Sequence, residues 1–468
     1  MNGVGLNDEL GRISRTGGAL CARTICLAGG TMLLLCAGPA GAVAQAPTDW
    51  RSPPGHEQLL PDSLDCWEPA LAVGPHRQVF VVAGRRTAPL RTSDFDQKLV
   101  IWRSNDAGAT FSAPSLVTTE GHFHYDQRMA VDAKGTIYVS YMDNETARPR
   151  SVTRLRLARS RDEGRTFSVE TVTTQRVSDK PELAVSADGT HIAIVYESSP
   201  GPALVASDDG GATWSEPRVV VQGEGRHFWP ETLAIAPDGG LWFAVPSMSG
   251  AEIAAGKQTP VRLHVFRSSD GGRQWHDSDF GSSPRFVKDC AHDPDCRVKA
   301  ADIAVAIDDR GHAYVTYMEG TGPGQPYALF LRSSTDAGRS WSKPQVVSAA
   351  PRPRSGDLAD HDFPMIAASG AGRVCVVWVD DRRGALDVWA RCSSDAGETW
   401  GPDVLFSDRS DGAAYKSSAG FKTFYGHYGG VAIDGSDRLH AAWGEGEPEY
   451  RTGAVWFNSI DLGDALRR

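Results

Sequence analysis

One short motif occurs six times in this chain and constrains its fold more than any other feature. It reads Ser-x-Asp-x-Gly-x, followed by Thr, Ser or Gln and then by Trp or Phe. The copies begin 47 to 66 residues apart, at Ser104, Ser160, Ser207, Ser268, Ser334 and Ser393. Alternating apolar runs flank each copy, and a period of this size is typical of the blades of a β-propeller.

The residue types of the motif suit a tight turn between two strands. Ser and Asp side chains can hydrogen-bond to the backbone of their own turn, and Gly adopts positive φ without steric cost. The closing aromatic residue then packs between sheets. We therefore predict a structural role, on the face away from the functional loops, for the six motif aspartates, Asp106, Asp162, Asp209, Asp270, Asp336 and Asp395.

A second unit, an apolar strand, a polar turn and another apolar strand, recurs seven times. Its copies begin at Glu68, Gln127, Pro181, Glu231, Asp302, Pro364 and Gly429. The count favours an all-β propeller of seven four-stranded blades, with six as the alternative. The last unit has a third strand from Gly453 but no turn motif, so we expect residues 57–60 to supply its fourth strand and close the ring.

Composition and the N-terminal segment limit the partners and the compartment. The 468 residues carry a formal net charge of -10, which disfavours nucleic-acid or anionic-membrane partners. Residues 1–46 resemble a secretory signal, because arginines precede an apolar run at 27–35 and the small residues Ala42–Ala44. We predict a secreted or periplasmic monomer without stable membrane insertion, whose propeller spans residues 47–468.

Five cysteines follow the predicted signal: Cys66, Cys290, Cys296, Cys375 and Cys392. Cys375 and Cys392 lie on two strands of a predicted hairpin and could face each other, Cys290 and Cys296 could close a small loop, and Cys66 is then left over. That loop and His361-Asp362 also offer ligands for a structural calcium ion. We expect no other metal or cofactor.

The loops at the other end of the blades, around the mouth of the channel, are the expected working face. Before the first strands they contain Trp67-Glu68, His122, His124-Tyr125-Asp126, Lys180, Glu182, His227, Trp229, Glu231, Asp302, His361-Asp362 and His427-Tyr428. After the second strands they contain Arg85-Arg86, Asp143, Glu197, Glu319, Asp380 to Arg383 and Glu445. We expect the function to depend on these side chains.

The six-fold motif resembles the Asp box of the sialidase family, and several blades resemble those of sialidases. The resemblance implies an exo-glycosidase acting on acidic, sialic-acid-like sugars. In that comparison Tyr428 corresponds to the tyrosine nucleophile of the family and Glu231 to the glutamate that activates it. Asp94 or Asp96 corresponds to the acid/base aspartate. The arginines that bind the substrate carboxylate correspond to Arg85 or Arg86 and to Arg382 or Arg383. Two or three guanidinium groups would hold the carboxylate of the substrate. Further substrate contacts are expected from Trp67, His124 and Asp126.

Two departures from the family pattern keep other functions open. The Arg-x-Pro motif of the first blade reads Trp67-Glu68-Pro69 here, and no arginine follows the second strand of the Glu231 blade. One alternative is a polysaccharide lyase that uses His124-Tyr125 or His427-Tyr428 on uronate polymers. Another is a propeller that binds a glycan or a protein without catalysis. For Arg382-Arg383, an ion pair with Asp380-Asp381 is the competing structural explanation.

Overall fold

The computed structural model describes most of the chain after the predicted signal. The described residues are 50–51, 55–64, 66–86, 97–119, 123–144, 153–175, 177–255, 260–283, 302–320, 326–351, 359, 361–383, 387–407, 416–417, 420–421, 429–446 and 453–467. Nearly all of the regular structure among them is β, because only two short helices occur, α1 (Gly250–Ala254) and α2 (Leu462–Leu466).

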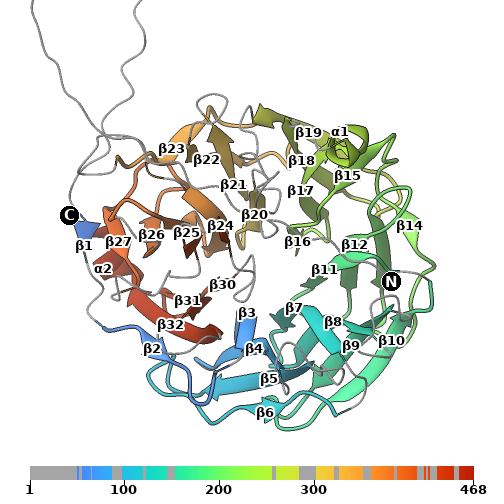
Figure 1. The fold of residues 1–468 in the computed structure, drawn as a ribbon, viewed down its shortest axis with the longest axis horizontal. Helices are drawn as coiled ribbons and strands as arrows, with labels where there is room; N and C mark the ends of the chain where they lie inside the picture. The colour runs from blue at the N-terminus through green and yellow to red at the C-terminus, as the bar shows by residue number, and fades with distance from the viewer. Residues whose placement is uncertain are drawn as a thin grey trace, which may run out of the picture. The chain divides into compact units, whose positions relative to one another are not determined.

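The first strands after the closing segment form one eight-stranded sheet (Figure 1). It contains β3 (Cys66–Val73), β4 (Val79–Arg86), β5 (Gln97–Ser104), β6 (Ser115–Leu116), β7 (Phe123–Val131), β8 (Ile137–Asn144), β9 (Thr153–Ser160) and β10 (Ser168–Thr173). The two halves, β3–β6 and β7–β10, are linked by a parallel pairing of β5 with β7.

Five further sheets have four or five strands each, the size of a single propeller blade. The first two contain β11 (Asp179–Val185), β12 (Ile192–Glu197), β13 (Ala203–Ser207) and β14 (Arg218–Val219), then β15 (Arg226–Phe228), β16 (Thr232–Ile235), β17 (Leu241–Ser249), β18 (Val261–Ser268) and β19 (His276–Ser283). The third contains β20 (Ile303–Ile307), β21 (Ala313–Gly320), β22 (Tyr327–Ser334) and β23 (Gln345–Ser348). The fourth contains β24 (His361–Ser369), β25 (Arg373–Asp380), β26 (Asp387–Ser393), β27 (Asp403–Leu405) and β1 (Trp50–Arg51), and the fifth β30 (Gly430–Ile433), β31 (Arg438–Gly446), β32 (Gly453–Asp461) and β2 (Gln58–Leu59). A short hairpin of β28 (Lys416–Ser417) and β29 (Gly420–Phe421) completes the described strands.

The all-β propeller is confirmed, but the predicted count of seven separate blades, or six, is not what the sheets display. Five sheets are separate and blade-sized, and the remaining strands are hydrogen-bonded into the eight-stranded sheet. The sequence units could not reveal this, because each unit specifies its own strands and not the hydrogen bonds between neighbouring units. The first strands of successive units contact one another around the centre, in the order β3, β7, β11, β16, β20, β24, β30 and back to β3 (Figure 1).

Apolar strands pack on both of their faces, which explains their sequence. In β25, every residue from Val374 to Val379 is buried, because one face packs against each neighbouring sheet. Four tryptophans, Trp102, Trp242, Trp378 and Trp389, are fully buried. Burial of such large aromatic side chains between sheets stabilises the fold.

The N-terminal segment closes the last sheet, as predicted. In β2, Gln58 pairs with Phe457 and Leu59 with Trp456 of β32, antiparallel. The Leu60 N–H extends this pairing by donating to the Val455 carbonyl at 2.9 Å. In addition, β1 pairs in parallel with β27 of the preceding sheet, a contact that the sequence did not predict.

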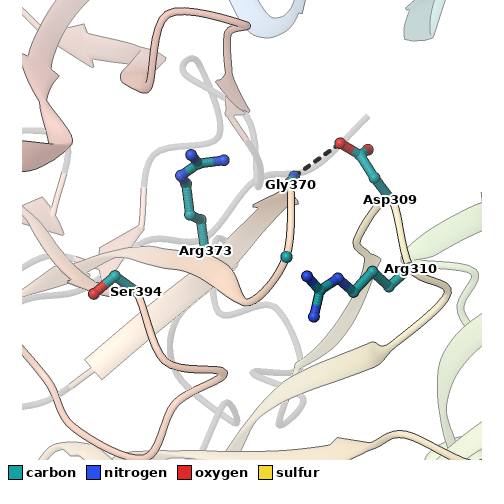
Figure 2. A pocket seen from close by; sticks show the side chains of 6 residues that line it. Asp309, Arg310, Gly370, Arg373 and Ser394 are labelled. Carbon is teal, nitrogen blue, oxygen red and sulfur yellow. Dashed lines mark hydrogen bonds between the residues drawn. The ribbon is translucent and has the colours of Figure 1, made fainter.

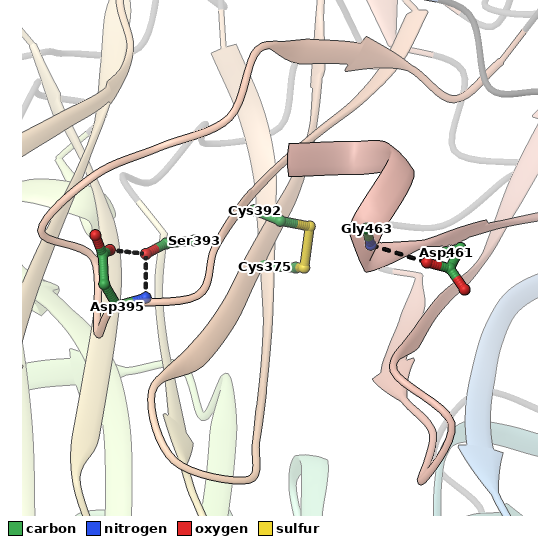
Figure 3. Close-up of a disulfide and its surroundings, with 6 residues drawn as sticks. All are labelled: Cys375, Cys392, Ser393, Asp395, Asp461 and Gly463. Atoms are coloured by element: carbon green, nitrogen blue, oxygen red, sulfur yellow. Dashed lines mark hydrogen bonds between the residues drawn. A yellow bond between two sulfur atoms is a disulfide. The ribbon is translucent and has the colours of Figure 1, made fainter. Parts of the chain in front are cut away.

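The six motif turns are closed by their own side chains, as Figure 3 shows for the turn at Ser393. The Ser393 hydroxyl donates to Asp395 Oδ1 at 2.7 Å and accepts the Gly397 N–H at 2.9 Å. The same Ser-to-Asp bond occurs in the other five copies. Hydrogen bonds from Thr166 and Thr213 help to lower the pKa of Asp162 and of Asp209 to about 2.

Strand register places these turns on one face. Val79, where β4 begins, pairs with Ser104 of the first motif and also with Val73 at the end of β3. The beginning of β3, at Cys66, pairs instead with Arg85 at the far end of β4. The motif aspartates therefore lie away from the end where the inner strands begin, as predicted.

A disulfide joins Cys375 and Cys392, which lie directly opposite each other on β25 and β26 (Figure 3). This pairing agrees with the hairpin expected from the sequence. Cys66 is buried, and its Sγ donates to the Leu64 carbonyl at 3.7 Å. Cys290 and Cys296 lie outside the described residues.

Candidate functional site

The inner strands begin with a repeated irregularity that turns side chains toward the centre. The pairing register shifts near the start of β3, β7, β11 and β24, so each strand carries a β-bulge there. At each bulge one non-glycine residue has a positive φ, with Glu68 and Asp126 at 51°, Lys180 at 47° and Phe363 at 53°. Bulges re-aim side chains, and non-glycine residues with positive φ concentrate at functional sites.

A cavity of about 260 Å³ lies among these strands, and its charged lining forms two ion pairs. Arg128 Nε lies 2.9 Å from both carboxylate oxygens of Glu182. Lys180 Nζ lies 3.0 Å from Glu231 Oε1. Arg128, Glu182, Glu231 and Asp302 line the cavity with apolar side chains that include Phe363 and Met365.

Charge interactions between neighbouring strands set the protonation of these groups. Burial alone would lower the pKa of Lys180, but the charges of Glu231 and Asp302 outweigh it and raise that pKa. Burial raises the pKa of Glu182, and Arg128 opposes this shift. The cavity thus places buried cations next to carboxylates, and the charged form of Lys180 is favoured by its acidic neighbours.

Two aspartates from adjacent strands meet beside this cavity. The backbone N–H of Lys180 donates to Asp179 Oδ1 at 3.1 Å and to Asp126 Oδ2 at 3.3 Å, which brings the two carboxyl groups together. Burial, a hydrogen bond with Asp126 and the charge of Asp126 raise the pKa of Asp179 to about 9. The charged form of Asp179 is therefore disfavoured by its neighbour Asp126.

Three further titratable groups lie around this pair, and one of them contacts a tryptophan ring. Glu197 is opposite Asp179 in the strand register, and burial raises its pKa to about 7. His227 Nε2 is 3.9 Å from Glu197 Oε2, and burial together with the charge of Lys180 lowers the histidine pKa. The Trp229 ring meets His227 edge to face, with centroids 4.6 Å apart, and burial raises the pKa of Tyr125 to about 12.

This acid group, Tyr125, Asp126, Asp179, Glu197 and His227, has the components of acid–base chemistry. It holds a carboxyl that is protonated at neutral pH, a second carboxyl that titrates near neutrality, and an imidazole that is neutral there. Carboxyl groups whose pKa values are pushed apart or toward neutrality are typical of proton donors and acceptors in active sites.

The arginines expected to bind a carboxylate are held by protein groups where the structure describes them. Arg382 is 7% exposed, with Nη2 2.6 Å from Asp380 Oδ2 and Nη1 2.5 Å from Asp403 Oδ2. Its guanidinium also lies 4.0 Å from the Trp389 ring centroid. The competing explanation, an ion pair, therefore describes Arg382.

Arg383 and Arg85 are less buried than Arg382. Arg383 Nη1 lies 3.7 Å from Asp387 Oδ1, and the Arg383 side chain is 28% exposed. Arg85 donates to the Asp62 carbonyl. Arg382 and Arg85 thus make protein contacts in different sheets, and neither joins the acid group.

Some of the remaining predicted site residues join the site, and others lie outside the residues that the structure describes. Glu231 and Asp126 both lie in it, and His124 is fully buried with Nε2 3.7 Å from Asp143 Oδ1. The predicted pairing of Tyr428 with Glu231 falls outside the described residues, which do not include Tyr428, Asp94, Asp96 or the side chains of Trp67 and Arg86.

Sequence reasoning overlooked Asp179 and Arg128, although it placed their neighbours Lys180 and Gln127 at the inner strands. A signal was present, because proline directly follows the positive-φ residue at Glu68, Lys180 and Phe363. Proline inside a strand pattern marks an edge or a bulge. Three such prolines in equivalent places predict the bulges that bring these side chains together.

A hollow on the opposite face has a different character (Figure 2). It is lined by Asp309, Arg310, Gly370, Arg373 and Ser394, from turns of two neighbouring sheets. Asp309 Oδ2 accepts the Gly370 N–H at 2.9 Å, and Arg373 forms an ion pair with Asp437 at 2.9 Å. These contacts join the turns, so we assign the hollow a structural role.

The part of the chain that the structure describes contains no group of three His, Cys, Asp or Glu side chains arranged to hold a metal ion. The loop 290–296, considered above for calcium, lies outside it. No helix within the described ranges is long and apolar enough to cross a membrane.

Residues 193–423 match the family described as BNR repeat-like domain. The matched region, 231 of the 468 residues, lies within the β-propeller described above. No curated protein shows a significant match to the chain.

Several solved structures are similar to the chain at low sequence identity. An ulvan lyase of polysaccharide lyase family PL25, bound to -[GlcA(1-4)Rha3S]-, has a TM-score of 0.53 at 11% identity and covers 88% of this chain and 100% of its own. A Hadza microbial sialidase has a TM-score of 0.44 at 16% identity, covering 86% of this chain and 66% of its own. A mutant of the NanB sialidase from Streptococcus pneumoniae has a TM-score of 0.42 at 11% identity, covering 87% and 71%. The similarity to the lyase supports the fold alone.

Proposed function

We propose that this protein processes glycans by acid–base chemistry at the acid group beside the central cavity. The proposal is supported by the BNR repeat-like domain, by the β-propeller fold and by the five titratable side chains that converge there. The observation that carries it is the Asp126–Asp179 pair around the Lys180 N–H, because a protonated carboxyl next to a carboxylate can donate a proton at neutral pH.

In the hydrolytic form of the proposal, the Asp179 carboxyl donates its proton to the glycosidic oxygen as the bond to the anomeric carbon breaks. Water attacks that carbon and gives its proton to the Glu197 carboxylate. Charge on Asp126 then favours return of a proton to Asp179. Two carboxyl groups in these roles are the usual requirement for glycoside hydrolysis.

The narrower hypothesis from the sequence is an exo-glycosidase acting on acidic, sialic-acid-like sugars with Tyr428 as nucleophile. It now requires Glu231 to leave Lys180 and activate Tyr428, with Asp94 or Asp96 as acid/base. Because Arg382 is bound by Asp380 and Asp403, the carboxylate clamp would depend on Arg86 and Arg383. The mechanism with Tyr428 as nucleophile therefore requires a larger rearrangement of side chains than hydrolysis at the acid group.

A polysaccharide lyase is the second candidate. One observation favours it: the His227 pKa is lowered, so its imidazole is neutral at neutral pH and could remove the proton next to a uronate carboxylate. Tyr125, whose pKa is raised to about 12, would then protonate the leaving oxygen.

The test compares the wild type with Asp179→Asn on aryl glycosides and on uronate polymers. We expect the wild type to release the aglycone and the variant to lose that activity at unchanged melting temperature or above it. An unsaturated product, abolished by His227→Ala, would instead establish the lyase. A wild-type protein that binds glycans but turns over neither substrate class would support the alternative, a propeller that binds glycans without catalysis.

Export, oligomeric state and blade count belong to the same proposal. We propose that residues 1–46 are removed on export and that the propeller acts as a secreted or periplasmic monomer. We also propose seven blades, because one residue pair, Gln97 with Phe123, joins the halves of the eight-stranded sheet, and each half has its own motif turn. An experimental structure and the mass of the secreted chain test these points.

A further inference from the structure

Four hydrogen-bonded side chains cross the sheet that carries His227. Arg226 Nε donates to Ser247 Oγ at 2.9 Å, and Arg226 Nη2 donates to the Ser247 carbonyl at 2.7 Å. Ser247 Oγ lies 2.9 Å from His264 Nε2, and His264 Nδ1 lies 2.9 Å from Asp277 Oδ2. We call these four residues the β15–β19 network, because they connect β15, β17, β18 and β19, four of the five strands of this sheet.

The bonding pattern of the β15–β19 network sets the direction of its protons. Arg226 can only donate, so the Ser247 hydroxyl accepts from it and gives its own proton to His264 Nε2. The other imidazole nitrogen, Nδ1, then carries the ring proton and donates to the Asp277 carboxylate. Each donor in the line thus meets an acceptor, which is the condition under which a buried polar network makes its surroundings rigid.

A serine, a histidine and an aspartate in this order also have the geometry of a nucleophile with its base. Ser247, however, is 0% exposed, and Arg226 already donates to its hydroxyl oxygen. A nucleophile has to contact its substrate, and this oxygen is covered. Any effect of the network on function therefore passes through a neighbouring strand.

The network holds the short strand β15 on both sides of His227. Arg226 is bonded as described, and the Phe228 ring packs against the His264 ring with centroids 5.8 Å apart. Successive residues of a strand point to opposite faces of the sheet, so Arg226 and Phe228 share one face and His227 has the other. The core agrees with this division, because Met248, opposite His227 in the register, is buried in a different cluster from Phe228. Fixing the two outer residues of β15 therefore fixes the direction of the imidazole between them.

On its own face, the His227 imidazole meets the acid group. Its Nε2 lies 3.9 Å from Glu197 Oε2, and its ring meets the Trp229 ring edge to face. Resting on the proposed function, we infer that the β15–β19 network positions His227 beside Glu197 by holding β15 in place. The members of the network are positioning residues, because they act through this strand and do not themselves touch a substrate.

The test follows the titration of His227 by nuclear magnetic resonance in the intact protein with isotope-labelled histidine. Its signal is assigned by its absence in His227→Ala. Burial and the charge of Lys180 lower the pKa of His227, so an imidazole that is released toward solvent should titrate closer to the ordinary value of about 6.5. We expect Asp277→Ala, at the exposed end of the network, to raise the midpoint by at least about 0.3 pH unit. Asp277→Asn keeps an acceptor oxygen for His264 Nδ1 and should retain the wild-type midpoint.

A second variant and a matched control make the result specific. His264→Phe keeps an aromatic ring beside β15 and removes both hydrogen bonds of the imidazole, so it should raise the His227 midpoint as well. Asp279→Ala is the control, because Asp279 lies on the same strand as Asp277 and its carboxylate accepts an N–H of its own turn at 2.7 Å. An unchanged midpoint in both network variants, or an equal shift in Asp279→Ala, would overturn the inference.

Turnover separates this inference from the proposed function. On the substrate class that the wild type accepts, Asp277→Ala and His264→Phe should lower kcat about tenfold and leave KM within about twofold, because misplacement of a group near the reacting atoms affects the chemical step more than binding. A wild type that turns over no glycan would refute the proposed function. The His227 titration would still decide whether the network positions this histidine, since it requires no substrate.

Discussion

Aspartates at the two ends of the sheets have opposite pKa shifts. On the motif face, each aspartate accepts hydrogen bonds from its own turn, and the pKa of Asp336 falls to about 2. At the other end, Asp179 meets Asp126 from a neighbouring strand, and its pKa rises to about 9. Hydrogen-bond donors surround the first carboxylate, whereas burial and a second carboxylate surround the other.

This difference in pKa distinguishes aspartates that stabilise a turn from aspartates that could transfer a proton. A carboxylate that is stabilised by several donors stays charged and holds a turn together. A buried carboxyl next to a like charge destabilises the fold in its charged form and is retained where proton transfer is useful.

The largest effect is expected from Asp179→Asn on turnover. Loss of a positioned proton donor lowers the rate by about 10²–10⁴-fold. The matched change on the motif face, Asp162→Asn, should leave turnover within about twofold of wild type, because that side chain bonds only within its own turn. Comparable rate losses in the two variants would contradict the division between the faces.

Arg382→Met is expected to destabilise the fold severely. Removal of Arg382 deprives the buried Asp380 and Asp403 of their closest cation, at a cost of about 3–5 kcal/mol. Arg165→Ala serves as the control, since its ion pair with Glu163 is exposed, at 60% and 42%, and its loss should change the free energy of unfolding by less than about 1 kcal/mol. A stable Arg382→Met variant that has lost affinity for acidic sugars would indicate that Arg382 binds the substrate.

Ser393→Ala tests the motif turn itself. The Ser393 hydroxyl is buried and accepts the Asp395 and Gly397 N–H groups, so its loss leaves buried donors unpaired at a cost of about 1–2 kcal/mol. Thermal unfolding should show this loss without any change in turnover. A loss of turnover at unchanged stability would be inconsistent with a purely structural turn.

The smallest effect is a pH dependence of stability. Because the pKa of Asp179 is higher in the folded state than in the unfolded one, its contribution to stability falls as the pH rises from about 4 toward about 9. Asp179→Asn removes this loss, and we expect it to raise the free energy of unfolding by more at pH 8 than at pH 5. A melting-temperature difference that does not grow with pH would indicate that Asp179 is charged in the folded protein.

Tertiary context decided which of the sequence candidates belong together. Arg382 and Arg383 are adjacent in sequence, yet one is enclosed by Asp380, Asp403 and Trp389 while the other is partly exposed. Glu231 was selected for a tyrosine partner, and the structure gives it Lys180 from the neighbouring sheet. Neither outcome could follow from spacing, because each depends on contacts between strands that are distant in sequence.

The sequence by itself determined the features that are built from short segments. Six turn motifs, the alternating strands and the position of residues 57–60 were sufficient for an all-β propeller whose last sheet is closed from the N-terminus. These features depend on hydrogen bonds within a few residues, or on one apolar pattern, and so can be read locally. Only the tertiary structure brought Asp126 to Asp179 and Lys180, because a bulge in β7 and another in β11 shift the register and aim side chains from the two strands at one point.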